Sequence, residues 1–211
     1  MRVLAIDTTS ENGSLALLED DRMVAEQTLQ APDGFAQVLF PAIEALLRQY
    51  DWKLDEIDIF AAASGPGAFT GVRVGLAGVK GLAEATGRTA QAVSNLRALA
   101  GQGTGPWRMP LINARRGEVY WGLFDEELNA TQEERIGPLD SLAPTLTPGI
   151  QLICRETWAE LTASGFSVSV DPRPLAGIVA RLALRDGGLD PAALDANYVR
   201  RSDADGRWRD G

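Results

Sequence analysis

Apolar positions divide the first part of the chain into short runs and one longer periodic stretch. Residues 2–7 form a short apolar run that ends in an acid, and residues 14–20 and 23–30 have the composition of two further strands. Apolar side chains then recur at helical spacing over roughly 35–50. Pro41 lies inside this stretch and is expected to kink the helix or to mark a late first turn.

The segments that follow alternate strand and helix. Residues 57–63 predict a strand, residues 64–71 a glycine-rich loop, and residues 70–85 a second helix. A short strand is expected at 89–93, and Ser94 is placed to cap a third helix. The order β-β-β-α-β-α-β-α is typical of an α/β fold in which helices cover the faces of a mixed sheet.

The second half of the sequence has the same order of elements in a shorter form. The polar, flexible stretch 102–106 predicts a boundary between a first lobe, residues 1–101, and a smaller second lobe, residues 102–211, with a mobile C-terminal tail. Beyond the boundary, the pattern predicts strands at 109–115, 117–124, 129–136, 151–154 and 166–170, helices at 156–164 and 175–187, and a proline-rich loop at 138–149. The likeness between the halves lies in element order alone.

Composition adds that the chain is acidic and contains no histidine. It has 211 residues, 20 Lys+Arg and 29 Asp+Glu, and a net charge of −9. The lack of His excludes a His-ligated metal, a His general base and a Ser-His-Asp triad. Cys154 is the single cysteine, so no intrachain disulfide can form, and no apolar run is long enough to span a membrane. We therefore expect a cytoplasmic protein that does not bind nucleic-acid phosphates by itself.

Two polar turns are candidate ligand sites. Asp7-Thr8-Thr9-Ser10 follows the first strand, where actin-like and sugar-kinase-like folds bind phosphate and metal, although short polar residues also simply favour turns. The loop 64–75, SGPGAFTGVRVG, joins a strand to a helix, and its glycines allow close backbone approach to a ligand or to a neighbouring chain. It is neither a Walker loop nor a dinucleotide fingerprint, so a tight turn is the alternative.

Two further segments carry arginine. NARRGEVY at 113–120 precedes an aromatic strand, and Arg115 and Arg116 could pair with phosphate or carboxylate or could form a solvated turn. Near the end, NYVRR at 197–201 leads into a polar tail.

Together these segments resemble one protein family. LAIDTTS at the start, SGPGAFTGVRVG, NARRGEVY and the late NYVR are similar to the motifs of the TsaB (YeaZ) family, which takes part in making N6-threonylcarbamoyladenosine in tRNA. The glycine-rich loop is the most specific of them. The resemblance implies a two-lobed actin-like (ASKHA, ribonuclease-H-like) ATPase fold.

The resemblance also implies a scaffold without catalytic activity. The TsaB family is similar to the catalytic TsaD family, whose His-x-x-x-His metal site this chain cannot form. The implied partners are a TsaD-type catalytic subunit and a TsaE-type ATPase, with a homodimer when the chain is alone and with tRNA contacted only through the complex. No metal and no cofactor are expected.

The resemblance assigns roles to three groups of residues. The partner interface is expected on the first two helices, at Phe35, Val38, Leu39, Val72, Arg73, Leu76, Ala77 and Lys80. The glycine-rich loop comprises Ser64, Gly65, Pro66, Gly67, Phe69, Thr70 and Gly71. The vestigial phosphate turn comprises Asp7, Thr8, Thr9 and Ser10. The chain departs from the family pattern at Phe35, where a His is frequent, and at Asn113, where an Asp is usual.

Two other functions compete with the scaffold. An active phosphotransferase of the actin-like fold would use Asp7 to hold a metal and the glycine-rich turn to hold phosphate. A peptidase is disfavoured because the chain lacks His and because Cys154 lies alone in an apolar strand.

Overall fold

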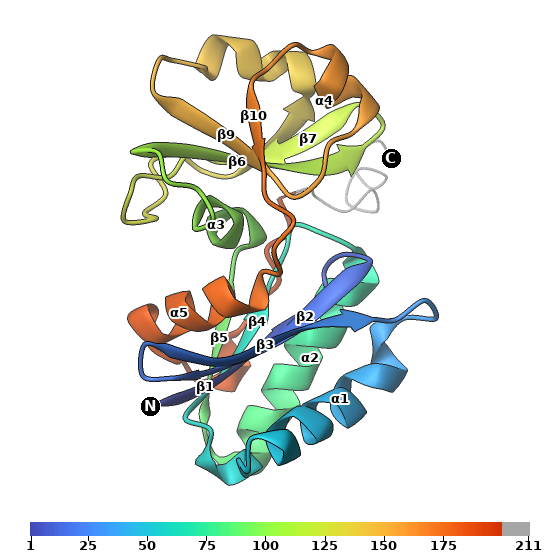
Figure 1. Ribbon diagram of the computed structural model, residues 1–211, viewed down its shortest axis with the longest axis vertical. Helices are drawn as coiled ribbons and strands as arrows, with labels where there is room; N and C mark the ends of the chain where they lie inside the picture. Colours follow the sequence, from blue (N-terminus) through green and yellow to red (C-terminus); the bar gives the residue numbers. More distant parts are fainter. Residues whose placement is uncertain (200–211) are drawn as a thin grey trace, which may run out of the picture.

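The computed structural model, which describes residues 1–199, contains two five-stranded mixed sheets, one above the other (Figure 1). The first sheet has the order β3-β2-β1-β4-β5, with β1 Arg2–Asp7, β2 Asn12–Glu19, β3 Arg22–Gln30, β4 Ile59–Ala63 and β5 Thr89–Val93. The second has the order β10-β9-β6-β7-β8, with β6 Trp107–Arg115, β7 Glu118–Trp121, β8 Arg135–Pro138, β9 Ile150–Cys154 and β10 Val168–Val170. The predicted α/β class is confirmed.

The helices begin and end close to where the sequence predicts. They are α1 Phe35–Gln49, α2 Phe69–Thr86, α3 Asn95–Ala100, α4 Ala159–Ala163 and α5 Ala176–Asp186, with short 3-10 segments at Leu54–Glu56 (η1), Leu139–Thr145 (η2) and Pro191–Ala193 (η3). Helix α1 continues past Pro41 as one element. Gly87 ends α2 in the left-handed conformation, at φ 65°. Ser94 caps α3, because its Oγ accepts hydrogen bonds from the N–H groups of Leu96 and Arg97.

The two sheets share one topology. In the first, β1–β2 and β2–β3 are antiparallel, whereas β1–β4 and β4–β5 are parallel. In the second, β6–β7 and β7–β8 are antiparallel, whereas β6–β9 and β9–β10 are parallel. The likeness in element order therefore extends to strand order and direction.

The last α-helix of each half packs on the sheet of the other half. Helix α3 follows the first sheet but contacts β6 and β9, and α5 follows the second sheet but packs on β1, β2 and β4 (Figure 1). Leu194 also joins the core of the first sheet. The boundary at residue 102 stays a prediction, while α5 and η3 pack with the first lobe.

Both faces of the first sheet are covered. Leu4 and Ile6 of β1 lie in the core beneath α1 and α2, and Val3 and Ala5 lie in the core beneath α5. A strand buried on both faces has a continuous apolar run instead of an alternating one, which explains residues 3–6.

Two predictions in the second half are wrong in detail. The strand expected at 129–136 is limited to Arg135–Pro138, because Asp125 accepts a hydrogen bond from the Asn129 N–H at 2.7 Å and closes a turn before it. The proline-rich loop contains η2. Among residues 1–199, no helix is long and apolar enough to cross a membrane.

Candidate functional site

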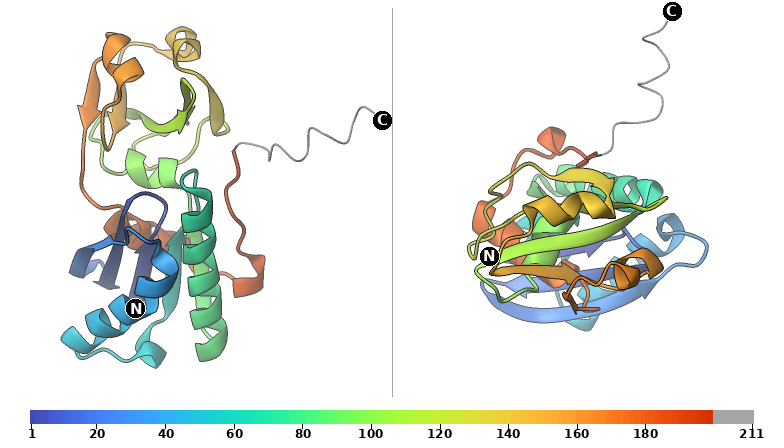
Figure 2. Two further views of the ribbon diagram at one scale, coloured as in Figure 1. Left: turned by 90° about the vertical axis from the view of Figure 1, so that its right-hand side faces the viewer. Right: turned by 90° about the horizontal axis from the view of Figure 1, so that it is seen from above.

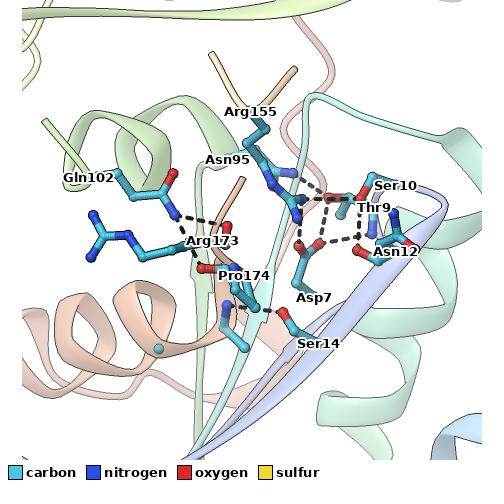
Figure 3. Close-up of polar contacts among 12 residues, drawn as sticks. Asp7, Thr9, Ser10, Asn12, Ser14, Asn95, Gln102, Arg155, Arg173 and Pro174 are labelled. Carbon is cyan, nitrogen blue, oxygen red and sulfur yellow. Dashed lines mark hydrogen bonds and ion pairs between the residues drawn. The ribbon is translucent and has the colours of Figure 1, made fainter. Parts of the chain in front are cut away.

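The candidate phosphate turn lies at the end of β1, in the space between the two sheets (Figure 3). Asp7 is fully buried, and its Oδ1 accepts hydrogen bonds from the Thr9 N–H at 2.9 Å and from the Thr9 hydroxyl at 2.6 Å. These bonds form a closed Asx turn, so one carboxylate oxygen of Asp7 is already occupied by the chain.

The glycine-rich loop packs directly on this turn. The Ala68 N–H donates to the Thr9 carbonyl at 2.7 Å, and the Thr8 hydroxyl donates to the Gly71 carbonyl at 2.7 Å. A Cβ added at Gly67 would lie 2.6 Å from the Thr9 carbonyl oxygen, and one at Gly71 would lie 1.8 Å from the Thr8 carbonyl oxygen. Both glycines are thus required by the close approach of two segments of the same chain.

Asn95, the first residue of α3, ties the loop to the turn. Its side-chain oxygen accepts from the Gly65 N–H at 2.9 Å, and its own N–H donates to the Gly65 carbonyl at 2.8 Å. Its side-chain amide also donates to the Thr9 hydroxyl. Sequence reasoning missed Asn95, and the only signal near it was the cap predicted at Ser94.

Arg155 covers the turn from the side of the second sheet (Figure 3). It follows β9, and its Nη1 lies 3.7 Å from Asp7 Oδ2 and donates to the Ser10 hydroxyl at 3.2 Å. Asp7 Oδ2 and Arg155 Nε are both buried and have no hydrogen-bond partner among the described residues. The guanidinium therefore supplies the positive charge beside Asp7.

Other polar groups between the sheets are also engaged. At the start of α5, the Ala176 N–H donates to the Ser14 hydroxyl at 3.2 Å, and the Gly177 N–H donates to Glu26 Oε1 at 2.6 Å. Burial raises the pKa of Glu26, against the lowering effect of the Gly177 hydrogen bond. The Gln102 side-chain amide donates to the Arg173 and Pro174 carbonyls. The bonds to Ser14 and Glu26 connect the start of α5 to the first sheet, and the Gln102 bonds fix the segment that leads into α5.

Asn197 of the late NYVR motif is hydrogen-bonded to the glycine-rich loop and to Glu134. Residues 190–199, the C-terminal strap, run beside α2 toward the glycine-rich loop (Figure 2). The Asn197 N–H donates to the Ser64 carbonyl at 2.8 Å, and its side-chain amide donates to Glu134 Oε2 at 2.6 Å. Glu134 also accepts from the Ser94 hydroxyl, and burial raises the pKa of its carboxyl.

The predicted partner-interface residues separate into two groups. Four lie in the core between α1, α2 and the first sheet, namely Phe35, Leu39, Val72 and Leu76. Their assignment to a surface is corrected, because each helix buries its apolar stripe against its own sheet. Arg73 and Ala77 are exposed, whereas Val38 and Lys80 are half-buried.

The arginines of NARRGEVY lie where β6 turns into β7: Arg115 ends β6, and Arg116 follows it in the turn. Arg115 and Arg116 adopt left-handed φ values of 66° and 56°, and the Arg115 N–H donates to the Asn113 side-chain oxygen at 2.8 Å. The charged β-turn is confirmed. Arg200 and Arg201 lie outside the described residues. Within residues 1–199, no group of three His, Cys, Asp or Glu side chains is placed to hold a metal ion.

Comparison with known proteins gives consistent matches. A family described as "TsaD: tRNA N6-adenosine threonylcarbamoyltransferase" matches residues 29–163. The tRNA threonylcarbamoyladenosine biosynthesis protein TsaB of Bacillus subtilis is 30% identical, over 99% of this chain and 98% of its own length. TsaB of Escherichia coli is 33% identical, over 92% of this chain and 84% of its own length.

The fold comparison agrees with these relatives. The solved structure of YeaZ from Pseudomonas aeruginosa is 27% identical and superposes with a TM-score of 0.78, over 93% of this chain and 100% of that one. The α/β fold with two five-stranded mixed sheets flanked by helices is thus shared with this solved structure. The identities of 30% and 33% over nearly the full length of two TsaB proteins, with the superposition on YeaZ, lead to one conclusion: the chain belongs to the TsaB family.

Proposed function

We propose that this chain is a non-catalytic subunit of the machinery that makes N6-threonylcarbamoyladenosine in tRNA. In this proposal it binds a TsaD-type catalytic subunit, and a TsaE-type ATPase docks on the pair. Its relatives in two bacteria carry the name of this biosynthesis, and its own sequence matches the family of the transferase. Family membership supports the pathway, and the geometry at Asp7 supports the non-catalytic role.

The main support for a non-catalytic role is that the glycine-rich loop packs against the turn at Asp7, where a phosphate would have to bind. A phosphate site needs free backbone N–H groups and room for the anion. Here the Ala68 and Gly65 N–H groups donate to Thr9 and Asn95, and the backbone at Gly67 and Gly71 touches the turn itself. An active phosphotransferase would have to open these contacts before it could bind a nucleotide phosphate.

The peptidase alternative has little chemical support. Cys154 is buried in β9, and burial raises the pKa of its thiol to about 11. A thiol with that pKa is almost entirely protonated at neutral pH, whereas the thiolate is the nucleophile.

The proposed partner surface uses what α1 and α2 leave accessible. Val38, Arg73, Ala77 and Lys80 remain from the predicted set, and Phe40 of α1 adds an exposed aromatic side chain. The same surface would allow self-association when the partner is missing. With a net charge of −9, the chain would contact tRNA only after a partner has bound it.

The test is co-purification with the TsaD homologue of the same organism, followed by measurement of the mass of the complex. Ala77→Glu places a charge on exposed α2 and should abolish the complex without changing the melting temperature. Ala163→Glu is the matched control, because it makes the same change on exposed α4 in the other half. A wild-type chain that forms no complex, or a complex unaffected by Ala77→Glu, would contradict the proposal.

A further inference from the structure

Two large aromatic side chains are exposed where the glycine-rich loop enters α2. Phe69 begins the helix and is 54% exposed, and Tyr198 of the C-terminal strap is 50% exposed. Their ring centroids are 5.8 Å apart, with the ring planes tilted by 33°. Exposed aromatic pairs of this kind are typical of contact surfaces on otherwise polar proteins.

Arg73 completes the group, one helical turn after Phe69. Its guanidinium carbon lies 3.7 Å from the Phe69 ring centroid, and its Nε donates to the Tyr198 hydroxyl at 3.1 Å. Arg88, Arg97 and Arg181 each pair with a carboxylate, whereas no Asp or Glu among the described residues pairs with Arg73. The guanidinium is thus held in place, and no carboxylate within residues 1–199 compensates its charge.

Internal hydrogen bonds fix the position of this group. Asn197, directly before Tyr198, donates to Ser64 and to Glu134. The backbone of the loop contacts the turn at Asp7, so the loop presents the Phe69 side chain to solvent instead of free N–H groups. Side chains that are ordered before binding lose little entropy when a partner docks.

We propose that Phe69, Arg73 and Tyr198 form the energetic centre of the partner surface, and that the partner protein places a carboxylate on Arg73 and apolar side chains against the two rings. This inference rests on the proposed function and names the chemistry of its interface. Because no carboxylate within residues 1–199 pairs with Arg73, its charge favours an acidic partner group. Tyr and Arg are also enriched among the few residues that dominate binding energy at protein interfaces. The group is continuous with the exposed face of α2 at Ala77. Arg73 covers a face of the Phe69 ring, which leaves less ring surface for stacking RNA bases.

The experiment is calorimetric titration of the purified TsaD homologue with full-length variants. Phe69→Ala and Arg73→Gln should each raise Kd by about tenfold or more. Tyr198→Phe keeps the ring, loses the hydroxyl that accepts from Arg73, and should raise Kd by only about two- to fivefold. Trp107→Ala is the matched control, because Trp107 is a 44% exposed aromatic on β6. Melting temperatures show that each variant is folded.

The possible outcomes separate the two proposals. If wild type binds and all variants bind within twofold of it, the partner surface stands and this inference is overturned. If wild type does not bind, both are overturned. The preformed complexes are also titrated with tRNA. If the variants lose affinity for tRNA but keep their affinity for the partner, the three side chains contact RNA and the inference is overturned.

Discussion

Replacing Gly71 by alanine tests the contact between the glycine-rich loop and the turn at Asp7. The added Cβ would lie 1.8 Å from the Thr8 carbonyl oxygen and 2.9 Å from its carbonyl carbon, so two backbone segments must move apart by more than about 1 Å. Overpacking of this kind costs about 1–3 kcal/mol, and this contact is severe because neither backbone has a flexible end. Loss of the Thr8–Gly71 and Ala68–Thr9 hydrogen bonds adds about 1 kcal/mol each. The free energy of unfolding should fall by roughly 3–5 kcal/mol.

The assay is thermal and urea unfolding of the isolated chain. For a protein of this size, the loss corresponds to a decrease in melting temperature of roughly 10 °C. Gly81→Ala is the matched control in the same helix, because a Cβ there meets nothing within 4 Å. That change should stabilise the chain by about 0.5–1 kcal/mol, since alanine restricts the unfolded chain more than glycine. A Gly71→Ala variant as stable as wild type would show that the loop does not pack on the turn.

Two further predictions concern charge. Burial raises the pKa of Glu134 above the ordinary glutamate value of about 4.3. Between that pH and the raised pKa the folded protein binds more protons than the unfolded chain, so Glu134 makes the fold less stable as pH rises through this range. Relative to wild type, Glu134→Gln should therefore gain melting temperature as pH rises above about 4.3, whereas a difference that does not change with pH would contradict the buried position of the carboxyl. In a titration with tRNA at physiological salt, the isolated chain should not bind, and its complex with the partner should bind more tightly than the partner alone; tight binding by the isolated chain would reveal a concentrated basic surface.

Local patterns were sufficient to predict most elements, because apolar spacing, glycine and capping residues act over a few positions. Ser94 and residues 35–49 are examples, since a helix cap and an apolar stripe can both be predicted from a few neighbouring residues. The contacts of Asn95 and Arg155 with the turn at Asp7 could not be predicted, because they join residues far apart in the sequence. Nothing near Arg155 distinguishes it from a solvated arginine.

Helical periodicity alone could not predict which residues of α1 and α2 are available to a partner. The stripe containing Leu39 and Leu76 predicts a buried face, but the pattern does not say whether the face is buried by the chain's own sheet or by another protein. The strand order resolves this, because α1 and α2 both cover the first sheet. The exposed Phe69 was part of a recognised motif, yet its contact with Tyr198 required the fold.

The central claim is that the chain contributes binding and no chemistry, and one reconstitution tests it most directly. The rate of N6-threonylcarbamoyladenosine formation on tRNA is measured with the complete set of partners and with wild type, Asp7→Asn or Ala77→Glu. Asparagine retains an oxygen that can accept from Thr9, so Asp7→Asn should preserve the complex and keep the rate within about twofold of wild type, whereas Ala77→Glu should abolish both. A folded Asp7→Asn chain that still forms the complex but loses orders of magnitude in rate would contradict the claim and establish a catalytic role for Asp7.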